Sequence, residues 1–166
     1  MLRLVDVKKR FGQIRAVDGL TLDIARGEVF GLLGPNGAGK TTALSMVMGL
    51  LAPDSGSIEI EGHGPTHEPR VRRIIGVAPQ TLALYDDLSA AENLAFFASL
   101  YGIGKTEARK RAAELLSLVG LDDRAKDRVK GFSGGMKRRL NLAAALVGDP
   151  EILLLDEPTA GVDPQS

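Results

Sequence analysis

The sequence contains no cysteine, which excludes disulfide bonds and thiolate chemistry and is compatible with a cytosolic setting. It also lacks any run of about 18 apolar residues, so we expect no direct insertion into a membrane. Any role at a membrane would then depend on a partner. Residues 1–10 mix apolar and charged side chains as a strand would, and we do not expect them to form a secretory signal.

An excess of charge is absent as well, because 21 Lys and Arg residues balance 21 Asp and Glu residues. No field over the whole molecule would therefore steer it toward nucleic acid or anionic lipid, and we expect no nucleic-acid partner. The length of 166 residues is enough for one domain with a buried core. Function must therefore be inferred from local motifs.

Residues 34–42, Gly-Pro-Asn-Gly-Ala-Gly-Lys-Thr-Thr, form the stretch around which the rest of the chain is organised. The apolar residues 28–33 before it predict a buried strand, and residues 43–50 after it carry apolar side chains at helical spacing. A strand, a glycine loop and a helix in this order are the context in which G-x-x-x-x-G-K-[ST] binds phosphate. A glycine-rich surface turn with a lysine is the alternative, and it does not require these flanking elements.

The glycines of this loop allow a tight turn that points successive N–H groups at phosphate oxygens, and the following helix adds the positive end of its dipole. Lys40 is expected to reach the β- and γ-phosphates, and the Thr41 hydroxyl is expected to bind Mg²⁺. The sequence therefore predicts a site for a nucleoside triphosphate. The residues expected to contact its phosphates are Gly34, Asn36, Gly37, Ala38, Gly39, Lys40, Thr41 and Thr42.

Three segments of alternating apolar and polar residues, 2–7, 20–24 and 55–62, predict a small antiparallel sheet beside the phosphate site. Phe11 lies between the first two, in an expected turn. Its ring could stack on a nucleobase, because both present an apolar face, or it could be tucked beneath the hairpin.

Two apolar runs predict buried parallel strands, and each ends in polar side chains. Residues 74–78 lead to Gln80, whose amide oxygen could bind Mg²⁺ or orient a water molecule. Residues 151–155 lead to Asp156 and Glu157. One of these acids could hold Mg²⁺ and the other could face an attacking water, although a strand end that merely meets solvent is the alternative.

The region between these strands predicts three helices. Residues 89–101 begin with a capping box from Ser89 to Glu92. Residues 106–119 follow, and both helices together predict a separate helical lobe. Residues 136–147 carry an apolar face at helical spacing.

The start of the third helix is unusual. Ser133 stands at the N-cap position, but Gly134 and Gly135 follow it and no Glu or Gln completes a capping box. This arrangement would leave helix N–H donors open to an incoming phosphate, or Ser133 could simply cap the helix. Residues 109–111, Arg-Lys-Arg, are expected on a solvated helix face.

Taken in order, these motifs resemble the nucleotide-binding domain of ATP-binding cassette (ABC) transporters, and the resemblance covers residues 1–166. The segment that resembles the family's signature motif reads Ser-Gly-Gly-Met, with Met136 where Gln is more usual. The matching segments are residues 34–42 for Walker A, Gln80 for the Q-loop, 133–136 for the signature, 152–157 for Walker B and 160–163 for the D-loop.

The resemblance implies an α/β fold, namely a P-loop NTPase core with a small antiparallel β subdomain and an inserted α-helical subdomain. It implies one ABC-type ATP-binding domain, with a nucleotide-binding part at 1–85, a helical subdomain at 86–147 and the Walker B and D-loop segment at 148–166. Family members continue to another strand, which carries a histidine that contacts the γ-phosphate. The C-terminal part of the core is therefore expected to be missing from this sequence.

The resemblance also implies a site for ATP and Mg²⁺. Phe11 matches the aromatic residue that stacks on adenine, and Glu157 matches the general base, with Gln80 as a further catalytic residue. Two such domains bind two ATP molecules head to tail, so the signature of one subunit contacts the γ-phosphate held by Lys40 of the other. The expected metal ligands are Thr41, Gln80 and Asp156, the expected signature contacts are Ser133, Gly134 and Gly135, and Asp163 belongs to the D-loop.

The resemblance further implies a separate membrane permease as partner, with the coupling helix of that permease received near residues 80–94. The domain would then be cytoplasmic and peripheral on the inner face of the cell membrane. Residues 133–140 and 161–164 resemble the drug, antibiotic or sodium exporter branch, which implies export. Two alternatives stay open: a soluble ABC protein that acts on ribosomes or DNA, and a remnant that binds nucleotide without turnover.

Overall fold

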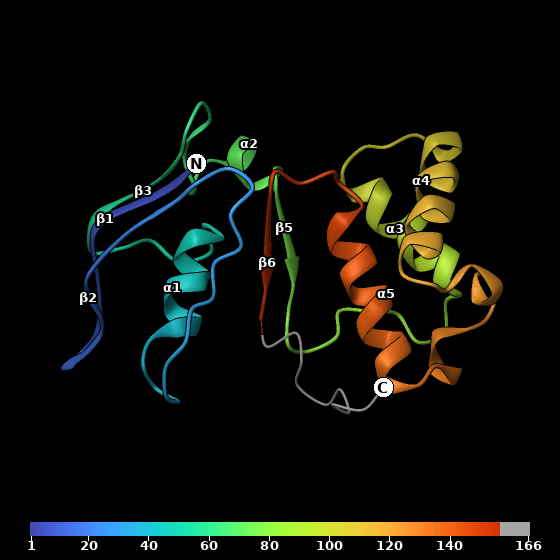
Figure 1. Ribbon diagram of the computed structural model, residues 1–166, viewed down its shortest axis with the longest axis horizontal. Helices are drawn as coiled ribbons and strands as arrows, with labels where there is room; N and C mark the ends of the chain where they lie inside the picture. The colour runs from blue at the N-terminus through green and yellow to red at the C-terminus, as the bar shows by residue number, and fades with distance from the viewer. Residues whose placement is uncertain (157–166) are drawn as a thin grey trace. The chain divides into compact units, whose positions relative to one another are not determined.

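The computed structural model describes residues 1–156 and divides the chain into two units, residues 1–72 and residues 73 onward. Figure 1 shows the elements of both. Each unit is described by itself. Glu157, Asp163 and the expected D-loop at 160–163 lie outside the described residues.

The first unit is built on a four-stranded antiparallel sheet in the order β2-β1-β3-β4, which confirms the predicted small antiparallel sheet. Alternation explains its packing, because Leu4 and Ile58 point into the core while their neighbours along each strand face outward. The helix α1 covers part of this sheet and buries Met46. The elements are β1 (Leu2–Phe11), β2 (Ile14–Ile24), α1 (Lys40–Val47), β3 (Ser55–Ile60), β4 (Gly64–Pro65) and α2 (Pro69–Arg72).

The strand predicted at residues 28–33 is wrong. In the described part of the chain this segment belongs to no strand, and Val29 and Leu33 are 99% and 92% exposed. A strand needs a neighbour that offers its own row of N–H and C=O groups, and no described strand pairs with this segment. The apolar side chains of this segment favour burial, but no described strand pairs with the segment to provide it.

The second unit contains a two-stranded parallel sheet of β5 (Ile75–Ala78) and β6 (Ile152–Leu155), which confirms the predicted parallel strand. The helix α5 (Gly134–Leu146) lies close to β5, because a Cβ atom on Gly76 would come within 2.3 Å of the Ala145 carbonyl oxygen. The expected burial of both faces of β6 is wrong, since Leu153 and Leu155 are 37% and 40% exposed. Successive side chains of a strand point to opposite faces of the sheet, so both leucines lie on the face opposite to that of the residues next to them. Burial of that face requires a covering layer as well as an apolar sequence.

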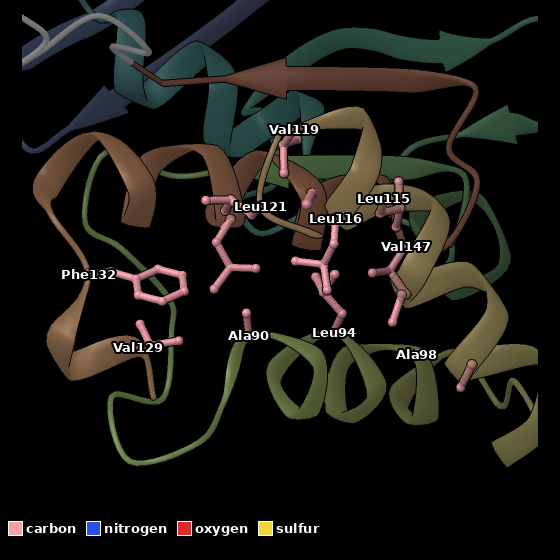
Figure 2. Packing of buried hydrophobic residues seen from close by; sticks show 14 residues of the cluster. Ala90, Leu94, Ala98, Leu115, Leu116, Val119, Leu121, Val129, Phe132 and Val147 are labelled. Atoms are coloured by element: carbon pink, nitrogen blue, oxygen red, sulfur yellow. The ribbon is translucent and has the colours of Figure 1, made fainter. Parts of the chain in front are cut away.

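Three helices form the main core of the second unit and confirm the predicted helical lobe. Figure 2 shows Leu94 of α3 facing Leu116 of α4, with Val129 and Phe132 at one end of the cluster. These elements are α3 (Ala90–Leu100), α4 (Lys105–Leu118), the short 3₁₀ helices η1 (Asp122–Arg124) and η2 (Val129–Gly131), and α5.

The capping box predicted at the start of α3 is confirmed. The Ser89 hydroxyl accepts a hydrogen bond from the Glu92 N–H at 3.2 Å, and the Glu92 carboxylate accepts one from the Ser89 N–H at 2.8 Å. These two bonds satisfy backbone donors that would otherwise lack a partner.

The basic segment on α4 is not uniformly solvated. The Arg111 guanidinium donates to the Leu146 carbonyl at 3.2 Å and to the Asp149 carboxylate at 3.0 Å, so this side chain ties α4 to the end of α5. Within residues 1–156, no helix is long and apolar enough to cross a membrane.

Candidate phosphate-binding site

The start of α1 offers open backbone donors. Gly39 is its N-cap residue, no side chain caps the first turn, and that turn carries no acidic residue. The first N–H groups of any helix lack partners within the helix, and the helix dipole places partial positive charge at the same point. The end of α1 is therefore suited to an anion.

Gly39 also determines where the loop lies. Its φ angle is 82°, and a Cβ atom at this position would come within 2.1 Å of the Ala16 carbonyl oxygen on β2. Only glycine combines this left-handed backbone with so close an approach. The glycine therefore holds the loop against β2.

Lys40 folds back over the loop that precedes it. Its ammonium donates to the Gly34 carbonyl at 2.7 Å and to the Pro35 carbonyl at 2.9 Å. The Ala38 N–H donates to the Pro35 carbonyl at 3.2 Å, which closes the turn. Phosphate oxygens would offer this ammonium charged acceptors in place of neutral carbonyls, and such hydrogen bonds are stronger.

A hollow of about 450 Å³ lies beside this loop, within the first unit. Ala16 and Val17 of β2 line it together with Ala38, Gly39 and Lys40. Its volume is in the range of small-molecule sites. Sequence reasoning missed the β2 residues, because nothing in their own pattern indicates that the glycine loop passes over them.

The other predicted loop residues lie at the surface of the same unit. Asn36 and Gly37 are exposed in the loop, Thr41 is exposed at the second position of α1, and Thr42 is half-buried at the third. The structure thus brings all the predicted phosphate-contacting residues into one loop and one helix start.

Phe11 is the last residue of β1, where it pairs with Ile14 across the hairpin. It is 50% exposed, so the ring is not tucked beneath the hairpin. The Lys9 ammonium lies 5.9 Å from the ring centroid. A cation at this distance is attracted to the ring, and the remaining exposed surface is available for stacking.

Asp54 fixes the backbone beside Phe11. Its carboxylate accepts hydrogen bonds from the Lys9 ammonium and from the Arg10 N–H, both at 2.7 Å. The bond from Lys9 and then that from Arg10 hold the pKa of Asp54 below its ordinary value, because both favour the charged form. This carboxylate stabilises the end of β1 that carries the ring.

Gln80 and Asp156 lie at one edge of the second unit. The β5–β6 register pairs Ala78 with Leu155, and the Asp156 N–H donates to the Ala78 carbonyl at 3.1 Å. Each residue thus follows the carboxyl end of one of two neighbouring parallel strands, with Gln80 exposed and Asp156 half-buried. This edge is where ligands bind in open α/β sheets.

The start of α5 shows both arrangements that the sequence left open. The Ser133 hydroxyl accepts a hydrogen bond from the Met136 N–H at 3.2 Å, so Ser133 caps the helix. Gly134 and Gly135 are nonetheless exposed, a Cβ atom at either position would point into open space, and the first turn carries no acidic residue. Their first-turn amides are therefore approachable by an anion.

Two buried asparagines escaped sequence reasoning. Asn93 is fully buried, and Asn141 is 5% exposed on α5. A polar residue on the apolar face of a helix is a signal for such a role, because a buried amide group requires hydrogen-bond partners.

The family model described as ABC transporter matches residues 17–160. The linearmycin resistance ATP-binding protein LnrL of Bacillus subtilis (strain 168) is 51% identical over 167 residues, covering 100% of this chain and 54% of that protein. The daunorubicin resistance ATP-binding protein DrrA3 of Streptomyces coeruleorubidus is 49% identical over 159 residues, covering 95% of this chain and 50% of that protein. The chain thus spans about half the length of these relatives.

A solved ATP-binding cassette, a dimer in a post-hydrolysis state bound to ADP and Pi, is similar with a TM-score of 0.85 and 31% sequence identity. The match covers 99% of this chain and 77% of that one. The expected fold class, an α/β P-loop NTPase core with a small antiparallel sheet and a helical lobe, is thereby confirmed.

Proposed function

This chain belongs to the ABC transporter family, and from that premise we propose that it couples ATP binding and hydrolysis to the export of a substrate through a separate membrane permease. The observation that carries the proposal is the uncapped start of α1 with the Lys40 ammonium lying over the preceding loop. Export is supported by relatives whose names give linearmycin resistance, daunorubicin resistance and Nod factor export.

ATP would bind through its phosphates to the glycine loop. The open N–H groups at the start of α1 would receive phosphate oxygens, and Lys40 would exchange its two carbonyl acceptors for the β- and γ-phosphates. The half-exposed ring of Phe11 would stack on adenine. The remaining phosphate contacts would come from Gly34, Asn36, Gly37, Ala38, Gly39, Thr41 and Thr42.

The chemistry of three oxygen-bearing side chains fits Mg²⁺. The Thr41 hydroxyl is exposed beside the loop, and Gln80 and Asp156 follow neighbouring strand ends of the second unit. Hydroxyl, amide and carboxylate oxygens are the donors that Mg²⁺ prefers, and it usually keeps water and substrate phosphates as well. A bound Mg²⁺ ion would neutralise charge on the phosphates of ATP.

Hydrolysis requires a base that accepts a proton from the attacking water. We assign this role to Glu157, which directly follows Asp156, and assign Gln80 to orient the water through its amide. Both assignments are based on the sequence, in which an amide side chain follows one of the two parallel strands and two carboxylates follow the other.

The start of α5 would act on a second copy of the chain. Exposed first-turn amides at Gly134 and Gly135 suit a γ-phosphate that arrives with a partner subunit, with Ser133 at the same helix end. We propose a head-to-tail dimer in which each ATP lies between Lys40 of one subunit and this segment of the other. Asp163, in the D-loop, would belong to the same interface.

The permease would contact residues 80–94. Tyr85 within this segment and Phe96 just after it are 49% and 36% exposed, and their rings pack edge to face with centroids 4.8 Å apart. An exposed aromatic pair suits the apolar face of a partner helix. The chain would then be cytoplasmic and peripheral on the inner face of the membrane.

Isothermal calorimetry with Mg-ATP tests the proposal through Lys40→Ala. We expect ATP affinity to fall about 10- to 100-fold, because hydrogen bonds to a charged group contribute about 1.5–3 kcal/mol. Lys110→Ala is the control, since Lys110 is exposed on α4 and its carboxylate partner Glu114 is 3.9 Å away. Equal ATP affinity in the wild type and in Lys40→Ala would contradict the proposal.

A further inference from the structure

Asn141 joins α5 to the loop that carries Gln80. Its side-chain Nδ2 donates to the Pro79 carbonyl at 3.2 Å, and its Oδ1 accepts from the Ala83 N–H at 3.3 Å. The side chain is buried, and these two partners lie on either side of Gln80. One amide group therefore holds both flanks of the loop.

The two bonds also determine the orientation of this amide. Turning it over would place the NH₂ group against the Ala83 N–H and the oxygen against the Pro79 carbonyl, so both hydrogen bonds would be lost. Leaving buried donors and acceptors without partners is unfavourable, so the observed orientation is the stable one. Asparagine is matched to one carbonyl and one N–H at these positions.

Other contacts hold the rest of the same segment. The Lys137 ammonium, also on α5, donates to the Asp86 carboxylate at 2.7 Å, and the Lys130 N–H donates to the Asp86 carbonyl at 2.9 Å. Asn93 accepts from the Tyr85 N–H at 2.8 Å and donates to its carbonyl at 3.0 Å. Of the side chains that hold this segment through hydrogen bonds, Asn141 is the one whose partners flank Gln80.

We propose that Asn141 is a positioning residue, which fastens the Gln80 loop to α5 so that Gln80 and the open helix start at 133–135 move as one body. Residues 79–85 contain no helix or strand of their own, so this side chain supplies order that the backbone does not. The inference rests on the proposed role of Gln80 in hydrolysis. Asn141 itself touches neither ATP nor water in this scheme.

The test is Asn141→Leu, which keeps the branching of the side chain but removes both hydrogen bonds. We expect the Ala83 amide to exchange hydrogen about 5-fold faster, because one hydrogen bond contributes roughly 1 kcal/mol. In ATP hydrolysis assays we expect kcat to fall about 10-fold and the Mg²⁺ concentration for half-maximal rate to rise. ATP affinity should stay within about 2-fold of wild type, because the phosphate-binding loop is untouched.

Two further variants of α5 test whether the effect comes from the hydrogen bonds of Asn141. Asn141→Asp keeps an acceptor for the Ala83 N–H and should lose less of kcat than Asn141→Leu. Arg139→Leu is the matched control, since Arg139 also donates to two backbone carbonyls, those of Val119 at 2.8 Å and Gly120 at 3.1 Å, but away from Gln80. It should lower thermal stability without changing the Mg²⁺ dependence.

The outcomes separate this inference from the proposed function. If Gln80→Ala lowers kcat but Asn141→Leu changes neither kcat nor Ala83 exchange, the positioning role is overturned while the role of Gln80 stands. If Gln80→Ala leaves kcat unchanged, the proposed role of Gln80 fails first. Should the Asn141 variants not fold, proton NMR of the wild type decides, because a nuclear Overhauser effect must link the Asn141 amide protons to the Ala83 N–H.

Discussion

At the scale of single residues, Phe11 tests whether the first unit recognises a base. We expect Phe11→Ala to weaken ATP binding about 5- to 100-fold, because stacking a base on an aromatic ring contributes about 1–3 kcal/mol. Phe11→Tyr should retain wild-type affinity, since it keeps the ring. Titration with a fluorescent ATP analogue measures both variants.

The cross-strand neighbour Ile14 provides the control for Phe11. It is 69% exposed and pairs with Phe11, so Ile14→Ala removes apolar surface from the same hairpin without removing a ring. Its ATP affinity should match wild type. A loss in Ile14→Ala as large as that in Phe11→Ala would mean that the hairpin, and not the ring, carries the effect.

The residues to which a functional role is assigned differ in how far sequence alone could identify them. Lys40 and its glycines were predictable, because their spacing lies within one short motif and the flanking helix is local. Asn141 was not, because its partners Ala83 and Pro79 lie 58 and 62 positions away along the chain. Such contacts depend on packing that no local pattern records.

At the scale of elements, the start of α3 makes folding sensitive to pH. The Ser89 N–H and then its hydroxyl hold the pKa of Glu92 below its ordinary value of 4.5, because both interact better with the carboxylate. A depressed folded-state pKa gives stability that is present above the ordinary value and is lost as pH falls through the lower folded value. We expect Glu92→Gln to flatten the acid dependence of the melting temperature over this range.

Ser89→Ala is the companion variant for the capping box. It should cost about 1 kcal/mol at neutral pH, since an N-cap side chain contributes about this amount. Circular dichroism melts from pH 3 to pH 7 would follow both variants. An acid dependence in Glu92→Gln as steep as that of wild type would show that this carboxylate does not contribute.

Helices and strands were predictable to different degrees for a physical reason. The capping box of α3 uses residues three apart, so sequence shows both partners at once. Residues 28–33 have an equally clear apolar pattern, yet a strand depends on a second strand that the pattern does not specify. The described residues contain no such neighbour, and Val29 stays exposed.

At the scale of the whole molecule, the proposed dimer makes a sharp prediction about mixed variants. Each ATP would lie between Lys40 of one subunit and residues 133–135 of the other, so Lys40→Ala and Gly135→Asp should each be inactive alone. In a heterodimer one site carries both changes and the other carries neither. Mixing equal amounts should restore hydrolysis to about a quarter of wild type, because half of randomly formed dimers have one intact site.

The choice of Gly135→Asp follows from its surroundings. A Cβ atom at this position would point into open space, so the carboxylate fits without distorting α5 and repels an incoming phosphate. Gly131→Asp is the matched control, because Gly131 is equally open but lies before the helix start, and it should keep full activity. Light scattering would follow association with ATP in the same samples. If the mixture gained neither hydrolysis nor ATP-dependent association over the separate variants, the two motifs would not act across a shared site.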